Sequence, residues 1–144
     1  MKKVLRKIKA FKDWFVIREK KEGGEISIYE ARKLLQKKEA IVLLDIRKRE
    51  EITLEYIGGA NFIPQEFLEE QVEILLPDKN VTVVVYCTDG VGSLEASKML
   101  REKGYSHVFS MAKGINGWKA AGYEVVRGFP MPRYLQAGQV AKRV

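Results

Sequence analysis

The chain has 144 residues, 46% of them hydrophobic, so it can bury one core of ordinary size and one domain is expected. No stretch approaches the roughly 18 consecutive apolar residues that cross a bilayer, and the basic N-terminus lacks the apolar run of a secretory signal. The net charge of +7 is concentrated at the ends: residues 1–22 carry +6 and 127–144 carry +4, whereas 23–126 carry −3. A nucleic-acid-binding protein would carry its basic residues on the folded body, so nucleic acid is not an expected partner.

Residues 1–24 are expected to form a basic amphipathic helix and a linker that ends at the glycine pair 23–24. Val4, Ile8, Phe11 and Phe15 recur at helical spacing, with lysines between them. Such a stripe can pack on the domain or on a second copy, lie on an anionic membrane surface, or dock an acidic partner protein. The oligomeric state stays open.

From residue 25 onward, expected helices and strands alternate along the chain. Ser27 followed by Glu30 is typical of a capping box at the start of a helix. The continuous apolar runs 41–44 and 81–86 are typical of strands that are buried on both faces of a parallel sheet. The expected elements are a helix at 28–38, a strand at 41–44, a short apolar segment at 60–63, a helix at 67–76, a strand at 81–86, a helix at 93–103, a strand at 108–109 and a helix at 114–121. This alternation predicts an α/β domain, a parallel sheet with helices on both faces.

The segment after the strand at 81–86 is the candidate site, because ligands collect at the carboxyl ends of parallel strands. It begins with Cys87, the only cysteine, and continues through a glycine-rich loop: Thr88, Asp89, Gly90, Val91, Gly92 and Ser93. Backbone N–H groups of such a loop and the following helix N-terminus can stabilise a thiolate or a persulfide anion. The alternative is that Cys87 is a small buried core residue. A single cysteine cannot form an internal disulfide, which fits a reducing cytoplasm and requires an outside thiol for any cysteine chemistry.

Five motifs in order make the body of the chain resemble a rhodanese-like domain. They are Leu44-Asp45-Ile46-Arg47 followed by Glu50-Glu51, then the segment 57–64, Val85-Tyr86-Cys87 with its six-residue loop, Gly104-Tyr105, and the segment 114–118. The resemblance covers residues 25–126 and leaves a basic C-terminal tail at 127–144. It implies a rhodanese fold and a persulfide on Cys87, supplied by a small sulfur donor and passed to a thiol acceptor.

The loop departs from the family pattern in its charge. Where the family often has arginine the chain has Gly92, Asp89 adds a negative charge, and Lys113 replaces the first glycine of a pair. One like-charge contact at about 6 Å and an effective dielectric of about 20 costs roughly 2–3 kcal/mol before salt screening. Thiosulfate, a dianion, is therefore not expected to be the best donor. Lys113 is a candidate to supply the missing positive charge.

Other residues are given structural roles. Asp45 and Arg47 are expected to be a cap and an ion pair with Glu50 or Glu51, and Trp118 to lie in the core. His107, the only histidine, is either a surface residue or a partner of Cys87. Nothing in the sequence has metal-ligand or nucleotide-binding spacing, so no metal or cofactor is expected. A cysteine phosphatase would need arginine at the position of Ser93.

Two functions remain open at this point. One is a sulfurtransferase or sulfur carrier that uses Cys87, and the other is a non-catalytic rhodanese-like binding module. Cys87 favours the first, and Asp89 with the missing arginine favours the second.

Overall fold

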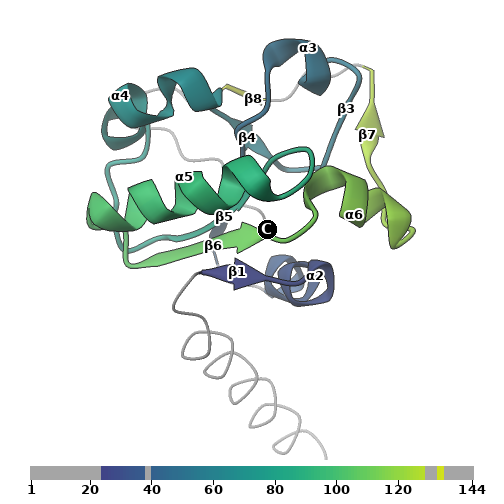
Figure 1. Ribbon diagram of the computed structural model, residues 1–144, viewed down its shortest axis with the longest axis horizontal. Coiled ribbons are helices and arrows are strands. Elements are labelled where there is room, and N and C mark those ends of the chain that lie inside the picture. The colour runs from purple at the N-terminus through teal and green to yellow at the C-terminus, as the bar shows by residue number, and fades with distance from the viewer. Residues whose placement is uncertain (1–23, 38–39, 129–132, 135–144) are drawn as a thin grey trace, which may run out of the picture.

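Six parallel strands form the main sheet of the protein in the computed structural model, which describes residues 24–37, 40–128 and 133–134 (Figure 1). Their order is β1-β6-β5-β2-β4-β8, with β5 and β2 at the centre. The bounds are β1 Glu25–Ile26, β2 Ile41–Asp45, β4 Asn61–Phe62, β5 Thr82–Tyr86, β6 His107–Met111 and β8 Arg133–Tyr134. A separate antiparallel pair joins β3, Glu55–Tyr56, to β7, Val126–Arg127.

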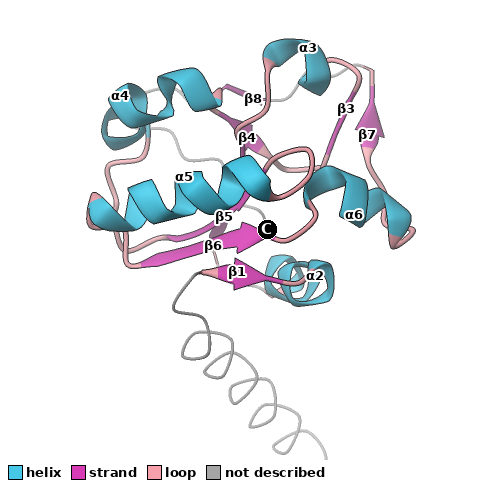
Figure 2. Ribbon diagram, in the orientation of Figure 1, coloured by secondary structure: helices cyan, strands magenta, loops and turns pink. Residues whose placement is uncertain are grey.

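Helices cover both faces of the sheet (Figure 2). They are α2 Ile28–Gln36, α3 Arg49–Ile52, α4 Gln65–Leu75, α5 Val91–Glu102 and α6 Gly114–Ala120. Side chains of α4 and α5 pack with one face of the sheet, and those of α2 and α6 pack with the other. The predicted α/β fold, a parallel sheet between helices, is confirmed.

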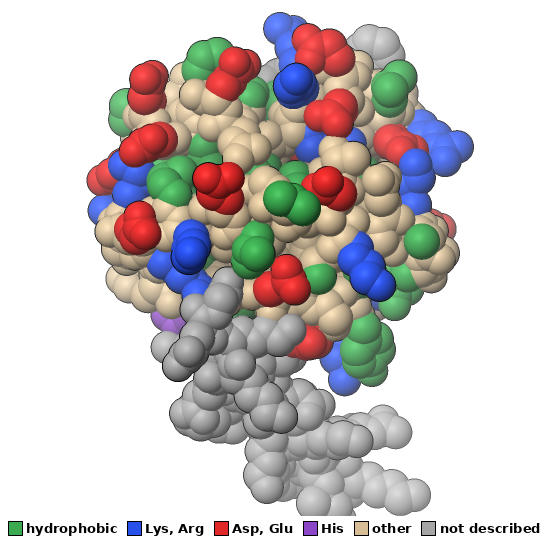
Figure 3. Space-filling model, viewed as in Figure 1, with side chains coloured by type: hydrophobic (Ala, Val, Ile, Leu, Met, Phe, Trp, Pro, Cys, Tyr) green, Lys and Arg blue, Asp and Glu red, His purple; other side chains and the backbone are tan. Residues whose placement is uncertain are grey.

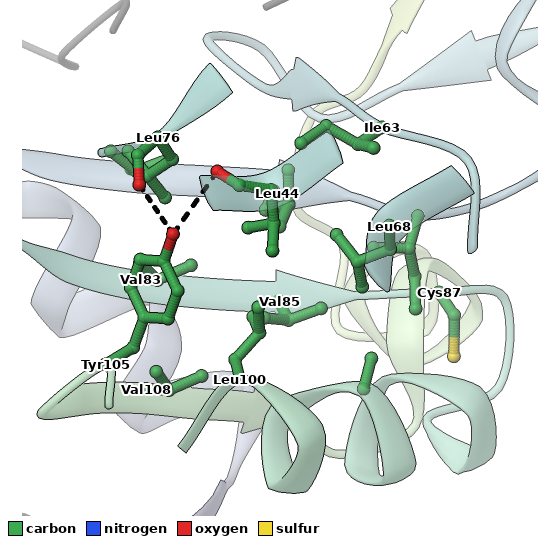
Figure 4. Packing of buried hydrophobic residues seen from close by; sticks show 14 residues of the cluster. Leu44, Ile63, Leu68, Leu76, Val83, Val85, Cys87, Leu100, Tyr105 and Val108 are labelled. Carbon is green, nitrogen blue, oxygen red and sulfur yellow. Dashed lines mark hydrogen bonds between the residues drawn. The ribbon is translucent and has the colours of Figure 1, made fainter. Parts of the chain in front are cut away.

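Successive side chains of the central strands point to opposite faces of the sheet and so contribute to two separate core clusters. In β2, Val42 and Leu44 pack toward α4 and α5, whereas Leu43 packs toward α2 and α6. Figure 4 shows the first of these clusters, where the Tyr105 hydroxyl donates to the carbonyl oxygens of Val72 and Leu76 at 3.2 and 2.5 Å. Both faces of β2 are therefore apolar, which is why its sequence reads as a continuous hydrophobic run.

The helices differ from the prediction in number and in bounds: α2 ends at Gln36 and not at residue 38, and α4 spans Gln65–Leu75 and not 67–76. The polar stretch after β2 forms the short helix α3, because the Glu51 carboxylate accepts the Lys48 N–H at 3.0 Å and caps its first turn. Helix α5 begins at Val91, not at residue 93. The cap predicted at Ser27 is present, with the Glu30 N–H donating to its hydroxyl at 3.1 Å.

The structure describes part of the predicted C-terminal tail but almost none of the predicted N-terminal helix. The N-terminal helix predicted for residues 1–24 lies outside the described residues, apart from Gly24. The segment predicted as a C-terminal tail contributes to both sheets, since Arg127 pairs with Glu55 and β8 pairs in parallel with β4.

Candidate functional site

Cys87 lies directly after β5, at the edge where the parallel strands end. The Ile46 N–H donates to the Tyr86 carbonyl at 3.2 Å, and the Gln65 N–H donates to the Ile46 carbonyl at 3.0 Å. The segments that follow β5, β2 and β4 thus meet at one point. The Cys87 side chain is 7% exposed and ends the core cluster beside Leu68 (Figure 4).

Polar groups of the next residues surround the sulfur. The N–H groups of Gly90 and Ser93 donate to Cys87 Sγ at 3.2 and 3.3 Å, and the Ser93 Oγ lies 3.4 Å from it. Gly90 adopts a φ of 92°, in the left-handed region that favours glycine. Two amide donors and the N-terminus of α5 therefore face the atom that would carry the charge of a thiolate.

Only the first three residues of the six-residue loop expected at 88–93 form a loop. Thr88, Asp89 and Gly90 make the turn, and the remaining three residues belong to the first turn of α5. Gly90 is the N-cap residue of this helix, and Asp89 leads into it through an Asx turn, in which its Oδ1 accepts the Val91 N–H at 3.0 Å. That N–H is consequently not turned toward the sulfur.

The Asp89 carboxylate lies closer to the Cys87 sulfur than the distance of about 6 Å used above for a like-charge contact. Its Oδ1 is 3.8 Å from Cys87 Sγ. Asp89 is exposed, so water weakens the repulsion between the carboxylate and an anionic sulfur. The contact places the Asp89 carboxylate where it can act on a charge carried by the sulfur, as the sequence predicts.

Cys87 opens into a pocket of about 350 Å³. Its walls come from the segments after β2, β4 and β5: Ile46, Arg47, Lys48, Glu51, Pro64, Gln65, Glu66, Cys87, Thr88, Asp89 and Gly92. Three carboxylates, two cations and no histidine are among these residues. Figure 3 shows acidic side chains interspersed with hydrophobic ones over the α4 and α5 side of the molecule.

Arg47 forms a buried ion pair with Asp45, so the expected pairing with Glu50 or Glu51 is wrong. Its Nε and Nη2 donate to the Asp45 carboxylate at 2.8–3.1 Å, and Nη2 also donates to the Glu55 carbonyl at 2.7 Å. Two residues apart on an extended chain, the side chains reach each other directly, whereas Glu51 turns back to cap α3. Of the two cations that line the pocket, Arg47 is therefore paired with a buried carboxylate. Among the described residues, Lys48 has no such buried partner.

Electrostatics around this pair keep the neighbouring groups in fixed charge states. Burial alone would lower the pKa of Arg47, but the hydrogen bonds and charge of Asp45 outweigh it and raise the pKa. Burial first, and then the charge of Asp45, raise the pKa of Tyr86 well above its ordinary value. Arg47 stays charged and Tyr86 stays neutral, so neither is a proton-transfer group.

Lys113 stands behind the turn, and its side chain is not part of the pocket wall. Its φ is 63°, and its backbone N would lie 2.6 Å from a Cβ at position 90. The next residue, Gly114, is as close, since a Cβ there would come within 2.3 Å of the Cys87 carbonyl oxygen. The backbone of this segment therefore presses against the Cys87 turn and fixes its shape.

Comparison with known proteins places this geometry in a family. A model of the rhodanese-like domain matches residues 27–121. The chain belongs to the rhodanese-like family. Thiosulfate sulfurtransferase GlpE of Coxiella burnetii (strain RSA 331 / Henzerling II) is 34% identical over 96 residues, which span 67% of this chain and 87% of that protein.

Two further rhodanese-like proteins show the extent of the match. Thiosulfate sulfurtransferase PspE of Escherichia coli (strain K12) is 42% identical over 65 residues, 45% of this chain and 62% of PspE. The crystal structure of the Alr3790 protein from Anabaena sp. superposes with a TM-score of 0.66 at 27% identity, covering 72% of this chain and 81% of that one. The range matched by the family model, residues 27–121, includes Cys87.

The structure also places residues that the sequence reasoning missed or left undecided. Glu51 of α3 accepts a hydrogen bond from the Thr88 hydroxyl at 2.8 Å and so ties α3 to the turn of the rhodanese-like site. His107 begins β6 and pairs with Thr82 at the start of β5, at the opposite end of the sheet from Cys87. A Cys87–His107 pair is therefore ruled out.

Two kinds of feature are absent from the described part of the chain. No group of three or more histidine, cysteine or acidic side chains could hold a metal ion among residues 24–37, 40–128 and 133–134. None of the helices described there is long and apolar enough to cross a membrane.

We expect Gly90→Ala to disrupt the rhodanese-like site. A Cβ at this position meets the Lys113 N at 2.6 Å in addition to the unfavourable φ of 92°, so unfolding free energy should fall by about 2–3 kcal/mol. Gly122→Ala is the matched control: its φ is 81° and nothing lies within 4 Å, so only the backbone strain of about 1–2 kcal/mol applies. Denaturant unfolding gives both values, and equal losses would contradict the close contact.

Proposed function

We propose that this rhodanese-like domain carries sulfane sulfur as a persulfide on Cys87 and passes it to a thiol acceptor. The observation that carries the proposal is the single cysteine at a pocket wall with two backbone N–H groups on its sulfur. The relatives named thiosulfate sulfurtransferase support the same chemistry. No histidine lines the pocket, so the amide donors must stabilise the thiolate without a neighbouring base.

In the first half-reaction the Cys87 thiolate attacks the outer sulfur of a donor persulfide, R–S–SH. A new S–S bond forms to Cys87, the S–S bond of the donor breaks, and the donor leaves as the thiolate R–S⁻. The product is Cys87–S–SH, and no oxidant or reductant is consumed. The inner sulfur keeps the place of Sγ, where the Gly90 and Ser93 N–H groups hold it.

In the second half-reaction an acceptor thiolate attacks the outer sulfur of Cys87–S–SH. The acceptor becomes a persulfide, and Cys87 leaves as a thiolate. Negative charge develops on Sγ in this step, at 3.2 and 3.3 Å from the two amide donors. These donors are oriented before the reaction begins, so they stabilise the leaving sulfur without reorganisation.

The charge of the pocket wall favours a donor with little negative charge. Glu51, Glu66 and Asp89 line it, and of the two cations Arg47 is already paired with Asp45. Thiosulfate would place two negative charges beside this acidic wall. A hydropersulfide or a polysulfide carries less negative charge for each sulfur atom that it can donate. We therefore propose a low-molecular-weight persulfide or polysulfide as the preferred donor.

The double variant Gly92→Arg with Asp89→Ser should increase thiosulfate turnover at least about tenfold, because it removes one repulsive charge and adds an attractive one. Gly92 lies in α5 without a positive φ, and a Cβ there would meet only the mobile end of Gln65, at 2.9 Å. Steady-state kcat/KM for thiosulfate and for a persulfide donor measures the change. Glu102→Gln with Asp78→Ser, at two exposed positions outside the pocket wall, raises the net charge by the same two units and is the charge-matched control.

Two results would contradict the electrostatic explanation. One is a wild-type protein that already uses thiosulfate as its best donor. The other is a loss of thiosulfate turnover in Lys113→Gly, which would show that Lys113 supplies the positive charge from outside the pocket wall.

The same acidic surroundings favour a second candidate, a rhodanese-like binding module that carries no sulfur. Asp89 at 3.8 Å from Sγ and glycine in place of arginine both weaken anion binding. Intact mass of the full chain after exposure to cysteine persulfide, polysulfide and thiosulfate separates the two. We expect a one-sulfur adduct that a reducing agent removes; no adduct with any donor would leave the binding module as the function.

A further inference from the structure

A chain of buried hydroxyl groups leads from β6 to the sulfur of Cys87. The Ser110 hydroxyl, on β6, donates to Ser93 Oγ at 2.8 Å, and Ser93 Oγ lies 3.4 Å from Sγ. Both serines are completely buried. Burial of two hydroxyl groups is unfavourable unless they are hydrogen-bonded, and in a low dielectric each bond of such a chain strengthens the next.

The hydrogen atoms of this chain can be assigned one by one. With Cys87 as the neutral thiol, Ser93 Oγ accepts from Ser110 and from the Cys87 S–H, and Ser93 donates its own hydroxyl proton to the Gly90 carbonyl over a long 3.3 Å. When Cys87 becomes anionic, its sulfur is a better acceptor than a neutral carbonyl, because hydrogen bonds to ionised acceptors are the stronger ones. The Ser93 proton can then turn to Sγ, and the Ser110 bond holds the oxygen in place while it turns.

The sheet fixes Ser110 in the position from which it donates. Ser110 pairs with Val85 of β5 and with Glu25 of β1 in parallel register, and its own N–H donates to the Gly24 carbonyl at 2.6 Å. Ser110 is thus held by two neighbouring strands, whereas Ser93 lies in the first turn of α5. The Cys87 turn and helix α5 are thereby joined to β6 by a side-chain hydrogen bond.

We propose that Ser110 is a positioning residue for the sulfur chemistry of Cys87, and that it acts through Ser93. It orients the Ser93 hydroxyl as a third donor to the anionic sulfur, beside the N–H groups of Gly90 and Ser93. The inference rests on the proposed function for its biological role, but the arrangement it proposes concerns the Cys87 thiolate of the free protein. It can therefore be tested without any sulfur donor.

The test is the pH dependence of Cys87 alkylation by iodoacetamide, which is unambiguous because the chain has one cysteine. Ser110→Ala should slow alkylation about three- to tenfold at pH 7 and move the pH of half-maximal rate upward, since one hydrogen bond to the anion is weakened. Ser97→Ala is the matched control: Ser97 is as deeply buried, on the same helix as Ser93, but its hydroxyl donates to the Leu94 carbonyl at 2.8 Å. Its pH profile should be that of the wild type.

A double-mutant cycle shows whether Ser110 acts through Ser93. In a Ser93→Ala background, Ser110→Ala should have no further effect on the pH profile, because the intermediate hydroxyl is gone. The charged groups that face Cys87 are unchanged in all of these variants: Arg47, Lys48, Glu51, Glu66 and Asp89. If Ser110→Ala does not fold, Ser93→Ala alone removes the proposed third donor and should move the pH profile in the same direction.

The outcomes are distinct from those that test the proposed function. An unchanged pH profile in Ser110→Ala, or an equal effect with and without the Ser93 hydroxyl, overturns the positioning role. Absence of a persulfide on the wild-type protein would refute the sulfur carrier and leave the alkylation result standing. A shifted profile with a normal Ser97→Ala control supports the chain from Ser110 to Cys87.

Discussion

Replacing Cys87 with serine is expected to abolish sulfur loading and transfer completely while the fold is retained. Every covalent sulfur step of the proposed function uses this sulfur, and the chain offers no second cysteine. Serine is nearly isosteric with cysteine, and the Gly90 and Ser93 N–H groups that now donate to Sγ can donate to the serine oxygen. Unfolding free energy should therefore change by less than about 1 kcal/mol.

Intact mass after incubation with a persulfide donor, together with transfer to a thiol acceptor, measures the loss. The wild-type protein alkylated on Cys87 before loading is the control, since it blocks the same atom without changing the sequence. Transferable sulfur on the serine variant would refute Cys87 as the carrier.

Replacing Arg47 with methionine is expected to lower the unfolding free energy by about 3–5 kcal/mol at pH 7, because removing one member of a buried ion pair leaves the other charge uncompensated. Asp45 and Arg47 are 1% and 5% exposed, so water cannot replace the lost partner. The variant also removes the hydrogen bond from Arg47 Nη2 to the Glu55 carbonyl, which joins the segment after β2 to β3. Urea unfolding monitored by tryptophan fluorescence gives the value.

Two comparisons make the measurement specific to the buried pair. Adding Asp45→Asn to Arg47→Met should restore part of the loss, since the buried charge is gone. Lys119→Ala breaks an ion pair with Glu55 that is open to solvent, and should cost less than about 1 kcal/mol. A loss in Arg47→Met no larger than in Lys119→Ala would contradict the role assigned to the buried pair.

The central strands and the place of Cys87 at their carboxyl ends could be predicted from the sequence. Strands β2 and β5 are buried on both faces, so their runs of apolar residues are continuous and hard to read as anything else. In a parallel sheet the residue after such a strand lies at the carboxyl edge, where ligands bind. The position of Cys87 directly after β5 therefore predicts its place at the site. The family motifs, spaced along one domain, pointed to the same cysteine.

Contacts between distant segments could not be predicted in the same way. Helix α3 is only four residues long and polar, and it depends on a cap from Glu51 that apolar periodicity does not reveal. The early start of α5 depends on which N–H the Asp89 carboxylate accepts. Ser110 reaches the site only through the register of β6 against β5, which no local pattern in the sequence contains.

Transfer of isotopically labelled sulfur tests the central proposal most directly. Cys87 is loaded with labelled sulfane sulfur from a persulfide donor, the donor is removed, and an acceptor thiol is added in a single turnover. We expect one labelled sulfur per chain on the loaded protein, and its loss should match the gain of label on the acceptor at the same rate. Label that never enters the protein, or that stays on Cys87 while the acceptor remains unlabelled, would contradict the proposal that this domain carries and transfers sulfur.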